Sequence, residues 1–282
     1  MQLDVDHLRS WIGRQEILTD RVTPVPVAAL SATLDRDDAL PKAGDPLPPL
    51  WHWLYFLPLA RQSLIGPDGH PRRGGFLPPV PLPRRMWAGG RFVFHAPLRV
   101  EEKITRTSTV MDVTVKNGRR GPLCFVLVRH EIAGDHGVAL AEEHDIVYRE
   151  AATPGEPPPP VRQAPDQAAW EREITPDDVL LFRYSALTFN GHRIHYDRRY
   201  VTEVEGYPGL IVHGPLIATL LVDLLRRNTG LPLRSFHFRA VSPLFDVKPF
   251  KVCGQPGANG TVALWACGMD GTLAMEAEAS VG

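Results

Sequence analysis

The chain has 282 residues, of which 44% are hydrophobic and 22% charged, a balance typical of a globular protein with a sizeable core. Its 31 Lys and Arg and 32 Asp and Glu leave a net charge of −1, which argues against a nucleic-acid-binding surface. Three cysteines without a CxxC spacing argue against a disulfide framework and favour a reducing, cytoplasmic location. The chain start lacks a signal-peptide core, and no apolar run reaches about 18 residues, so we expect no membrane span.

The first half of the chain has the pattern of an antiparallel sheet. Pro- and Gly-rich stretches between residues 40 and 90 predict ordered loops. Segments rich in β-branched residues follow, and a hairpin turn is predicted at "KNGRRG" between two of them. The predicted strands cover residues 90–98, 101–118, 122–134 and 139–150.

A proline-rich stretch separates the two halves. Residues 151–166, "AATPGEPPPPVRQAPD", hold too many prolines for a helix or a central strand, so they predict a stiff linker. The linker divides the chain into an N-terminal domain of residues 1–150 and a C-terminal domain of residues 167–282.

The second half adds two helices to its strands. "ITPDDVLLFRYSAL" predicts a short helix capped by Thr175, with Pro176 in the first helical position. Residues 213–230, "HGPLIATLLVDLLRRNTG", predict a longer helix that starts at Gly214. Because this helix is apolar on nearly every face, it should be buried all round. Further strand patterns fill the rest of the chain.

A buried helix wrapped by a curved antiparallel sheet is the plan of a hotdog domain. A β-branched–Thr–Pro pattern occurs at Val22 and again at Ile174, which indicates that the two halves are copies. We therefore expect an α+β tandem hotdog, each half a sheet around a central helix. The first copy has no polar bend, so it should act as a non-catalytic substrate clamp.

The bend between the helices of the second half concentrates polar chemistry. "TFNGHRIHYD", residues 188–197, contains Asn190 and His195, and Gly214 opens the following helix. A histidine can take a proton from water near neutral pH, and an amide can orient that water. The free N–H groups at a helix start can bind an oxyanion. Together they suit the addition of water to an enoyl thioester.

The segment from Tyr184 to Leu216 resembles the signature of MaoC-like hydratases and dehydratases. That signature is Gly-Asp-x-Asn-Pro-[apolar]-His, and its histidine matches His195, whereas Asn190 stands in place of its aspartate. "LTFNGHRIHYD" and "EGYPGLIVHGPL" are similar to the branch of 3-methylfumaryl-CoA (mesaconyl-CoA) and itaconyl-CoA hydratases and mitochondrial 3-hydroxyacyl-thioester dehydratase. The first-half stretches "DGHPRRGGFLPPVPLPRRMWAGG" and "EEHDIVYRE" resemble the longer members of that branch.

The resemblance implies a hydratase that forms citramalyl-CoA, with His195 as general base, Asn190 positioning the water or thioester, and Gly214 holding the enolate oxygen. It implies a homodimer and an acyl-CoA substrate without a cofactor. The free carboxylate of a dicarboxylic acyl group also needs a cationic partner. Arginine suits this role, because a guanidinium binds a carboxylate in bidentate fashion. The candidate substrate-binding residues are Arg193, Arg84, Arg85, Trp87 and His213, and the candidates for a second proton carrier are His192 and Asp197.

Other interpretations remain open. His195 could be a structural histidine, and His192 and His195 form an H-x-x-H pair that lacks a third metal ligand at a convincing spacing, so we expect no metal. The nearest rival function is a 3-hydroxyacyl-CoA or acyl-carrier-protein dehydratase acting on monocarboxylic chains. Because Asn190 replaces an acid, a non-catalytic acyl-CoA-binding partner or sensor is a further alternative.

Overall fold

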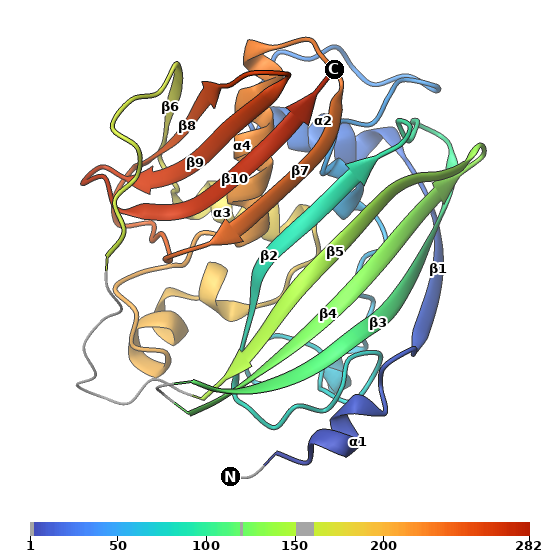
Figure 1. The fold of residues 1–282 in the computed structure, drawn as a ribbon, viewed down its shortest axis with the longest axis vertical. Helices are drawn as coiled ribbons and strands as arrows, with labels where there is room; N and C mark the ends of the chain where they lie inside the picture. The colour runs from blue at the N-terminus through green and yellow to red at the C-terminus, as the bar shows by residue number, and fades with distance from the viewer. Residues whose placement is uncertain (1–2, 119–120, 151–160) are drawn as a thin grey trace.

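The computed structural model describes residues 3–118, 121–150 and 161–282, and its ten strands form one antiparallel sheet (Figure 1). The strand order is β1-β3-β4-β5-β2-β7-β10-β9-β8-β6. The strands are β1 (Gln15–Arg21), β2 (Arg84–Phe94), β3 (Lys103–Gly118), β4 (Gly121–Gly134), β5 (Gly137–Arg149), β6 (Trp170–Ile174), β7 (Leu233–Ala240), β8 (Phe250–Pro256), β9 (Thr261–Gly268) and β10 (Leu273–Val281).

The sheet consists of two five-stranded parts with the same internal order. In each part the first strand is followed across the sheet by the third, fourth, fifth and second, and β2 pairs with β7 where the parts meet. We call residues 3–150 the first half and 161–282 the second half. The expected α+β hotdog fold is confirmed. The division at the proline-rich stretch stays a prediction, because most of that stretch lies outside the described residues.

The second half wraps its strands around one long helix, as expected. The helices are α1 (Val5–Arg9), α2 (Pro24–Thr33), α3 (Asp178–Leu187) and α4 (Gly214–Asn228), with short helical turns η1 (Trp51–Leu54), η2 (Gln62–Leu64), η3 (Arg193–His195) and η4 (Tyr200–Val204). Every residue of α4 from Leu216 to Leu225 is buried. Among its described residues the first half has no helix of that length, and α2 and η1 pack into its core instead.

Two local predictions differ from the structure, and a third agrees with it. The N-cap of α3 is Asp177 and not Thr175, because the Asp177 side chain accepts the Leu180 N–H. Strand β2 starts at Arg84, inside a stretch predicted as loop. The hairpin predicted at "KNGRRG" joins β3 and β4, which pair up to Gly118 and Gly121, and its two central residues lie outside the described part.

A buried ionic cluster ties the halves together. The Asp223 carboxylate on α4 is fully buried and accepts hydrogen bonds from Arg172, from Arg227 and from Arg36 of the first half. Arg172 and Arg227 also donate to the backbone oxygen of Leu34. These contacts hold α4 against the segment that follows α2.

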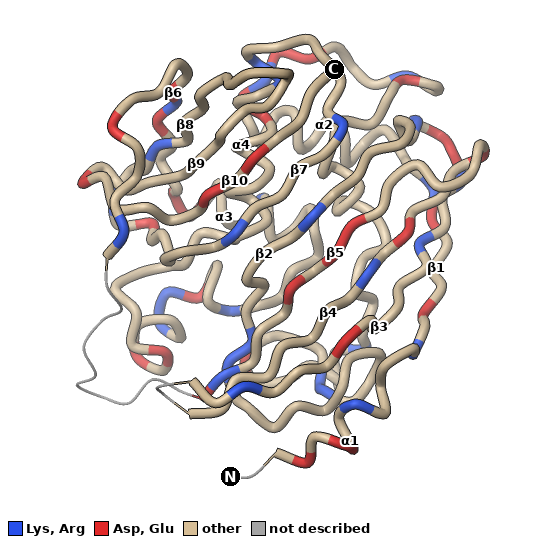
Figure 2. The backbone as a smooth tube through the Cα atoms, in the orientation of Figure 1, with Lys and Arg blue, Asp and Glu red and all other residues tan. Residues whose placement is uncertain are grey.

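The strands of the sheet contain charged residues of both signs, as Figure 2 shows along the backbone. Arg91 on β2, for example, bonds to Glu143 and Asp145 on β5. Within the described residues, none of the helices combines the length and apolar character that crossing a bilayer requires.

Candidate active site

The polar bend is shaped by Asn190. The backbone N–H of Asn190 donates to Ser185 O at the end of α3, and its Oδ1 accepts the His192 N–H at 3.0 Å. Such a side-chain-to-backbone bond two residues on stabilises a tight turn. The preceding residue, Phe189, has a φ of +50°. Asn190 therefore directs the chain that carries His192 and His195.

His195 lies at the end of η3 and is 8% exposed. Its Nδ1 lies 2.7 Å from the carbonyl oxygen of Ile211. Because a carbonyl oxygen only accepts, Nδ1 carries the hydrogen and Nε2 of the neutral ring keeps a lone pair. Burial lowers the pKa of His195 to about 4, although the bond to Ile211 opposes the shift. His195 is therefore neutral at pH 7 and can accept a hydrogen bond from water.

His213, the N-cap of α4, supports the His195 ring. The two imidazoles stack with centroids 3.7 Å apart, and His213 Nε2 lies 2.8 Å from the Ser185 hydroxyl. His213 is completely buried, and burial holds its pKa well below the usual value. These contacts give His213 a packing role beneath His195 rather than the direct substrate contact expected from the sequence.

The start of α4 offers free hydrogen-bond donors beside these rings. The first N–H groups of a helix lack intrahelical acceptors, and the helix dipole favours negative charge there. Within the described residues we find no acceptor for the Gly214 N–H, and nothing lies within 4 Å of the place that a Gly214 Cβ would occupy. An oxygen atom of a substrate can thus approach this N–H closely.

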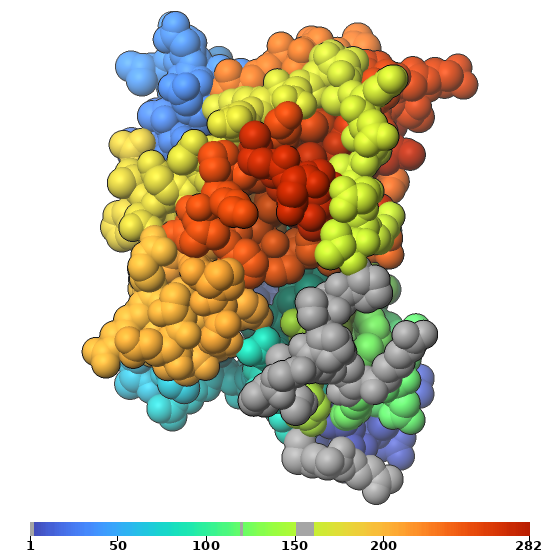
Figure 3. Space-filling model, turned by 90° about the vertical axis from the view of Figure 1, so that its left-hand side faces the viewer, coloured from blue at the N-terminus to red at the C-terminus, as the bar shows by residue number. Residues whose placement is uncertain are grey.

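A loop of the first half, residues 65–71, lies directly on the bend. Arg193 donates from its backbone N–H to Asp68 O and from its guanidinium to Pro67 O. Gly69 approaches Gly191 so closely that an added Cβ would lie 1.8 Å from the Gly191 oxygen. Figure 3 shows the light-orange segment of the second half lying against the cyan segment of the first, which emerges below it.

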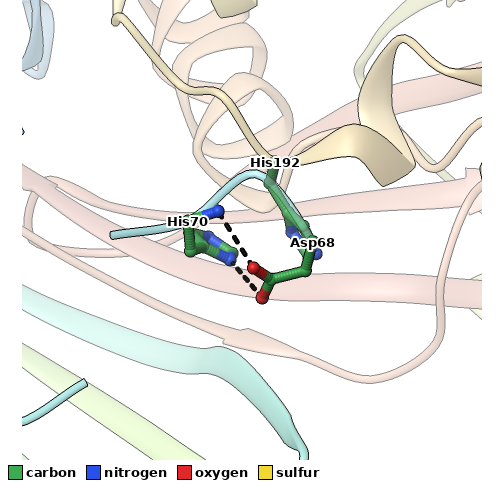
Figure 4. Close-up of side chains that lie close together, drawn as sticks. All are labelled: Asp68, His70 and His192. Atoms are coloured by element: carbon green, nitrogen blue, oxygen red, sulfur yellow. Dashed lines mark hydrogen bonds and ion pairs between the residues drawn. The ribbon is translucent and has the colours of Figure 1, made fainter. Parts of the chain in front are cut away.

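That loop brings Asp68 and His70 to His192 (Figure 4). The Asp68 carboxylate accepts from His70 Nδ1 at 3.2 Å and from the His70 backbone N–H at 3.1 Å. The rings of His70 and His192 lie 4.0 Å apart, and those of His192 and His195 5.5 Å apart. Sequence reasoning missed Asp68 and His70, although they lie in "DGHPRR", a stretch that resembles related hydratases.

Two predicted site residues bond to each other. The Arg193 guanidinium donates twice to Asp197 and lies over the Tyr200 ring. Asp197 also accepts the Tyr200 N–H, and this bond, followed by that from Arg193, lowers its pKa. Since Arg193 is fully engaged, it is not the free cation that the sequence led us to expect. Asp197 caps a turn rather than replacing the motif's aspartate.

The two arginines at the start of β2 differ. Arg84 bonds to the Tyr207 hydroxyl and lies 3.4 Å from a Glu205 carboxylate oxygen. Arg85 lies opposite Tyr148 on β5 and pairs with no carboxylate among the described residues. Its positive charge acts on His70, the histidine of the first-half loop. Of the three arginines predicted to bind substrate, Arg85 is therefore the one without a carboxylate partner among the described residues, and its charge also acts on the Tyr148 hydroxyl.

Trp87 belongs to a separate buried polar cluster in the first half. Its ring lies 4.0 Å from that of His144, and Glu142 accepts from the side chains of His52 and Trp53. The donor atoms of Glu142, His144 and His130 lie within 4.8 Å of one another, as metal ligands could. The nearby positive charge of Arg106 disfavours a cation there.

Two cavities, of about 400 and 550 Å³, lie near the C-terminal end of α4 and share Arg226. None of their lining residues belongs to the histidine group at the helix start. A helix of 15 residues is roughly 22 Å long, so these cavities are remote from that group.

Comparison with known proteins shows the family. The family described as hydroxyacyl-thioester dehydratase type 2 matches residues 50–246. Mesaconyl-C(4)-CoA hydratase of Chloroflexus aurantiacus is 49% identical over 97% of this chain and 97% of that protein. Mitochondrial hydroxyacyl-thioester dehydratase type 2 of Schizosaccharomyces pombe is 27% identical over 86% of this chain and 91% of its own length. The structure of a MaoC-like dehydratase from Phytophthora capsici has a TM-score of 0.69 at 13% identity, covering 99% of this chain and 98% of that one, and so shares the fold. The chain belongs to the hydroxyacyl-thioester dehydratase type 2 family of hotdog proteins.

Proposed function

We propose that the protein reversibly adds water to a short dicarboxylic enoyl-CoA, 3-methylfumaryl-CoA (mesaconyl-CoA) or itaconyl-CoA, giving citramalyl-CoA. The observation that carries this proposal is the 49% identity to mesaconyl-C(4)-CoA hydratase over 97% of both chains. The site supports it, because a neutral buried histidine lies beside a helix start with a free N–H group. Hydration of either ester needs no metal and no redox cofactor when imidazoles move the proton.

His195 is the residue we propose to bind and activate the catalytic water, as part of the general base. Its Nε2 lone pair accepts a hydrogen of the catalytic water, whose oxygen attacks Cβ of the enoyl thioester. The negative charge that develops on the thioester oxygen is bound by the Gly214 N–H at the positive end of α4. Asn190 contributes by fixing the bend that carries His195, through its bond to the His192 N–H.

Arg85 is the residue we propose to bind the free carboxylate. In 3-methylfumaryl-CoA this carboxylate is attached to Cβ, so its cation must lie next to the group that activates the water. Arg85 meets that requirement, since its charge acts on both His70 and His192. Arg84 and Arg193 have carboxylate partners within the protein. Because Arg85 lies on β2, the first half would then help to bind the substrate, in the clamp role expected from the sequence.

A second candidate function follows from the family description. A hydroxyacyl-thioester dehydratase would use the same histidines in reverse on monocarboxylic chains, with no need for Arg85. Substrate preference distinguishes the hydratase from the dehydratase. A non-catalytic acyl-CoA-binding role is distinguished from both enzymes, because it predicts binding without turnover.

The test is a panel of CoA esters, in which liquid chromatography separates each ester from its hydration product. The purified protein would receive 3-methylfumaryl-CoA, itaconyl-CoA, 3-methylcrotonyl-CoA and crotonyl-CoA. The proposal predicts that kcat/KM for a dicarboxylic ester is at least 100-fold higher than kcat/KM for 3-methylcrotonyl-CoA, in which a methyl group replaces the carboxylate. Preference for crotonyl-CoA would favour the dehydratase instead. Binding of every ester without turnover would refute both enzymatic functions.

A further inference from the structure

The bend itself lacks a carboxylate that can help its base. The motif's aspartate is Asn190 here, and Asp197 is bonded to Arg193 and Tyr200. A base that takes a proton from water becomes positively charged. His195 is poorly suited to hold that charge alone, because it is buried and, among the residues that the structure describes, its ring hydrogen-bonds only to the Ile211 carbonyl.

Asp68 is a carboxylate that does face the histidine group. It binds His70 through both oxygens, one to Nδ1 and one to the backbone N–H, so the ring is fixed and Nε2 remains as the acceptor. An imidazole held in this way by a carboxylate is the arrangement that stabilises an imidazolium during proton transfer. Asp68, His70 and His192 form a compact group, with one side-chain N or O atom of each within 4.8 Å of the others, and the His195 ring lies next to that of His192.

We propose that His70, positioned by Asp68, is the second half of the general base and takes up the proton of the catalytic water. The first half of the chain thereby supplies the carboxylate that the hydratase motif lacks at Asn190. The inference rests on the proposed hydratase function and deepens it. It also changes the role of the first half, which becomes part of the catalytic machinery rather than a clamp alone.

The proposed step balances as follows. The water lies between His195 and His70, with one hydrogen directed to each Nε2. One O–H bond breaks, the oxygen bonds to Cβ, and the π electron pair moves to the thioester oxygen held by Gly214. The proton resides on His70 beside Asp68. When the enolate collapses, that proton forms the new C–H bond at Cα, and His70 is neutral again.

Two features of the loop support this role. Its position is fixed by the contact of Gly69 with Gly191 and by the bond from Arg193 N to Asp68 O, so His70 is held against the bend. Within the pair, His70 donates hydrogen bonds and the Asp68 carboxylate accepts them. Metal ligands would instead direct lone pairs at one ion, whereas Asp68 directs both of its oxygens at hydrogens of His70.

The experiment uses the full chain and its best enoyl-CoA. We expect His70→Gln to lower kcat at least 100-fold and Asp68→Asn at least tenfold, with KM changed less than threefold, in line with general-base catalysis. The double variant should be no slower than His70→Gln within a factor of two, because the pair acts as a unit. Asp38→Asn is the matched control, a carboxylate with 33% of its side chain exposed and bonded to Arg36, and should stay within twofold of the wild type.

A pH profile separates proton transfer from mere support. Burial lowers the pKa of His70 and the bond to Asp68 opposes that shift, so kcat/KM should fall on the acid side as His70 is protonated. Asp68→Asn should move this acid limb to lower pH. A drop in kcat without movement of the limb would refute the assigned role, as would variants that keep more than half of kcat.

Two further outcomes distinguish failure of this inference from failure of the proposed function. Loss of activity after dialysis against EDTA, restored by Zn²⁺, would show that Asp68, His70 and His192 act as a metal site and overturn the proposal. A wild type that hydrates no ester would overturn the proposed function itself. If Asp68→Asn does not fold, as judged by circular dichroism, His70→Gln still decides the matter.

Discussion

Replacing Asp223 by Asn tests the ionic cluster that joins the two halves. The carboxylate has no exposed surface and accepts from three arginines, at 2.6 Å for Arg36, 2.7 Å for Arg227 and 3.0 Å for Arg172. The amide has nearly the same volume but only one acceptor oxygen. In either orientation its NH₂ group faces at least one guanidinium in a dry site. Removing one partner of a buried ion pair costs about 3–5 kcal/mol.

For a chain of this size about 1 kcal/mol corresponds to roughly 2 °C, so Asp223→Asn should lower Tm by about 6–10 °C. Differential scanning calorimetry would measure the change. Asp38→Asn serves as control, because Asp38 also bonds to Arg36 but its side chain is 33% exposed, and it should cost less than about 1 kcal/mol. A Tm for Asp223→Asn within 2 °C of the wild type would refute the view that this cluster fastens α4 to the first half.

Three other predictions concern the site and the pH range. Gly69→Ala should reduce kcat at least tenfold, because the new Cβ would collide with Gly191 O, whereas Gly75→Ala, with open space around it, should be neutral in the same assay. Gly214→Ala should leave the urea midpoint unchanged or raised, since nothing opposes its Cβ, yet lower kcat/KM because that Cβ occupies the approach to the N–H group; unchanged kinetics would contradict the oxyanion assignment. Burial lowers the pKa of four histidines far below the unfolded value of about 6.5, so the neutral folded form is favoured and stability falls as pH drops below 6.5. Between pH 6.5 and 5.5 each should cost about 1 kcal/mol, about 4 kcal/mol together, in urea unfolding, and a constant free energy of unfolding would contradict this. These histidines are His130 (pKa about 3), His192 (about 2), His195 (about 4) and the fully buried His213.

The fold could be predicted where the sequence signal is local and strong. The apolar run of α4 and the β-branched strands β3 to β5 gave the hotdog plan directly. The edge strand β1 was missed because its residues alternate between exposed and half-buried, without a fully buried position. The bond between Asp223 and Arg36 was also out of reach, since Arg36 lies 187 residues away in the chain.

The site divides in the same way. His195, Gly214 and Asn190 lie within one continuous segment, so their spacing pointed to them. Asp68 and His70 reach the bend only through the packing of a distant loop, which no local pattern reveals. The homodimer and the cytoplasmic location stay predictions.

The central claim is that the histidine group at the start of α4 hydrates an enoyl-CoA. The most direct measurement is kcat and KM of His195→Gln beside the wild type on 3-methylfumaryl-CoA, with CoA-ester binding followed by calorimetry. Glutamine preserves a polar side chain of similar reach but lacks the imidazole Nε2 lone pair that holds the catalytic water for proton transfer. Our account predicts a loss in kcat of at least 100-fold with the ester still bound within threefold. A variant that retains more than a tenth of the wild-type kcat would contradict it.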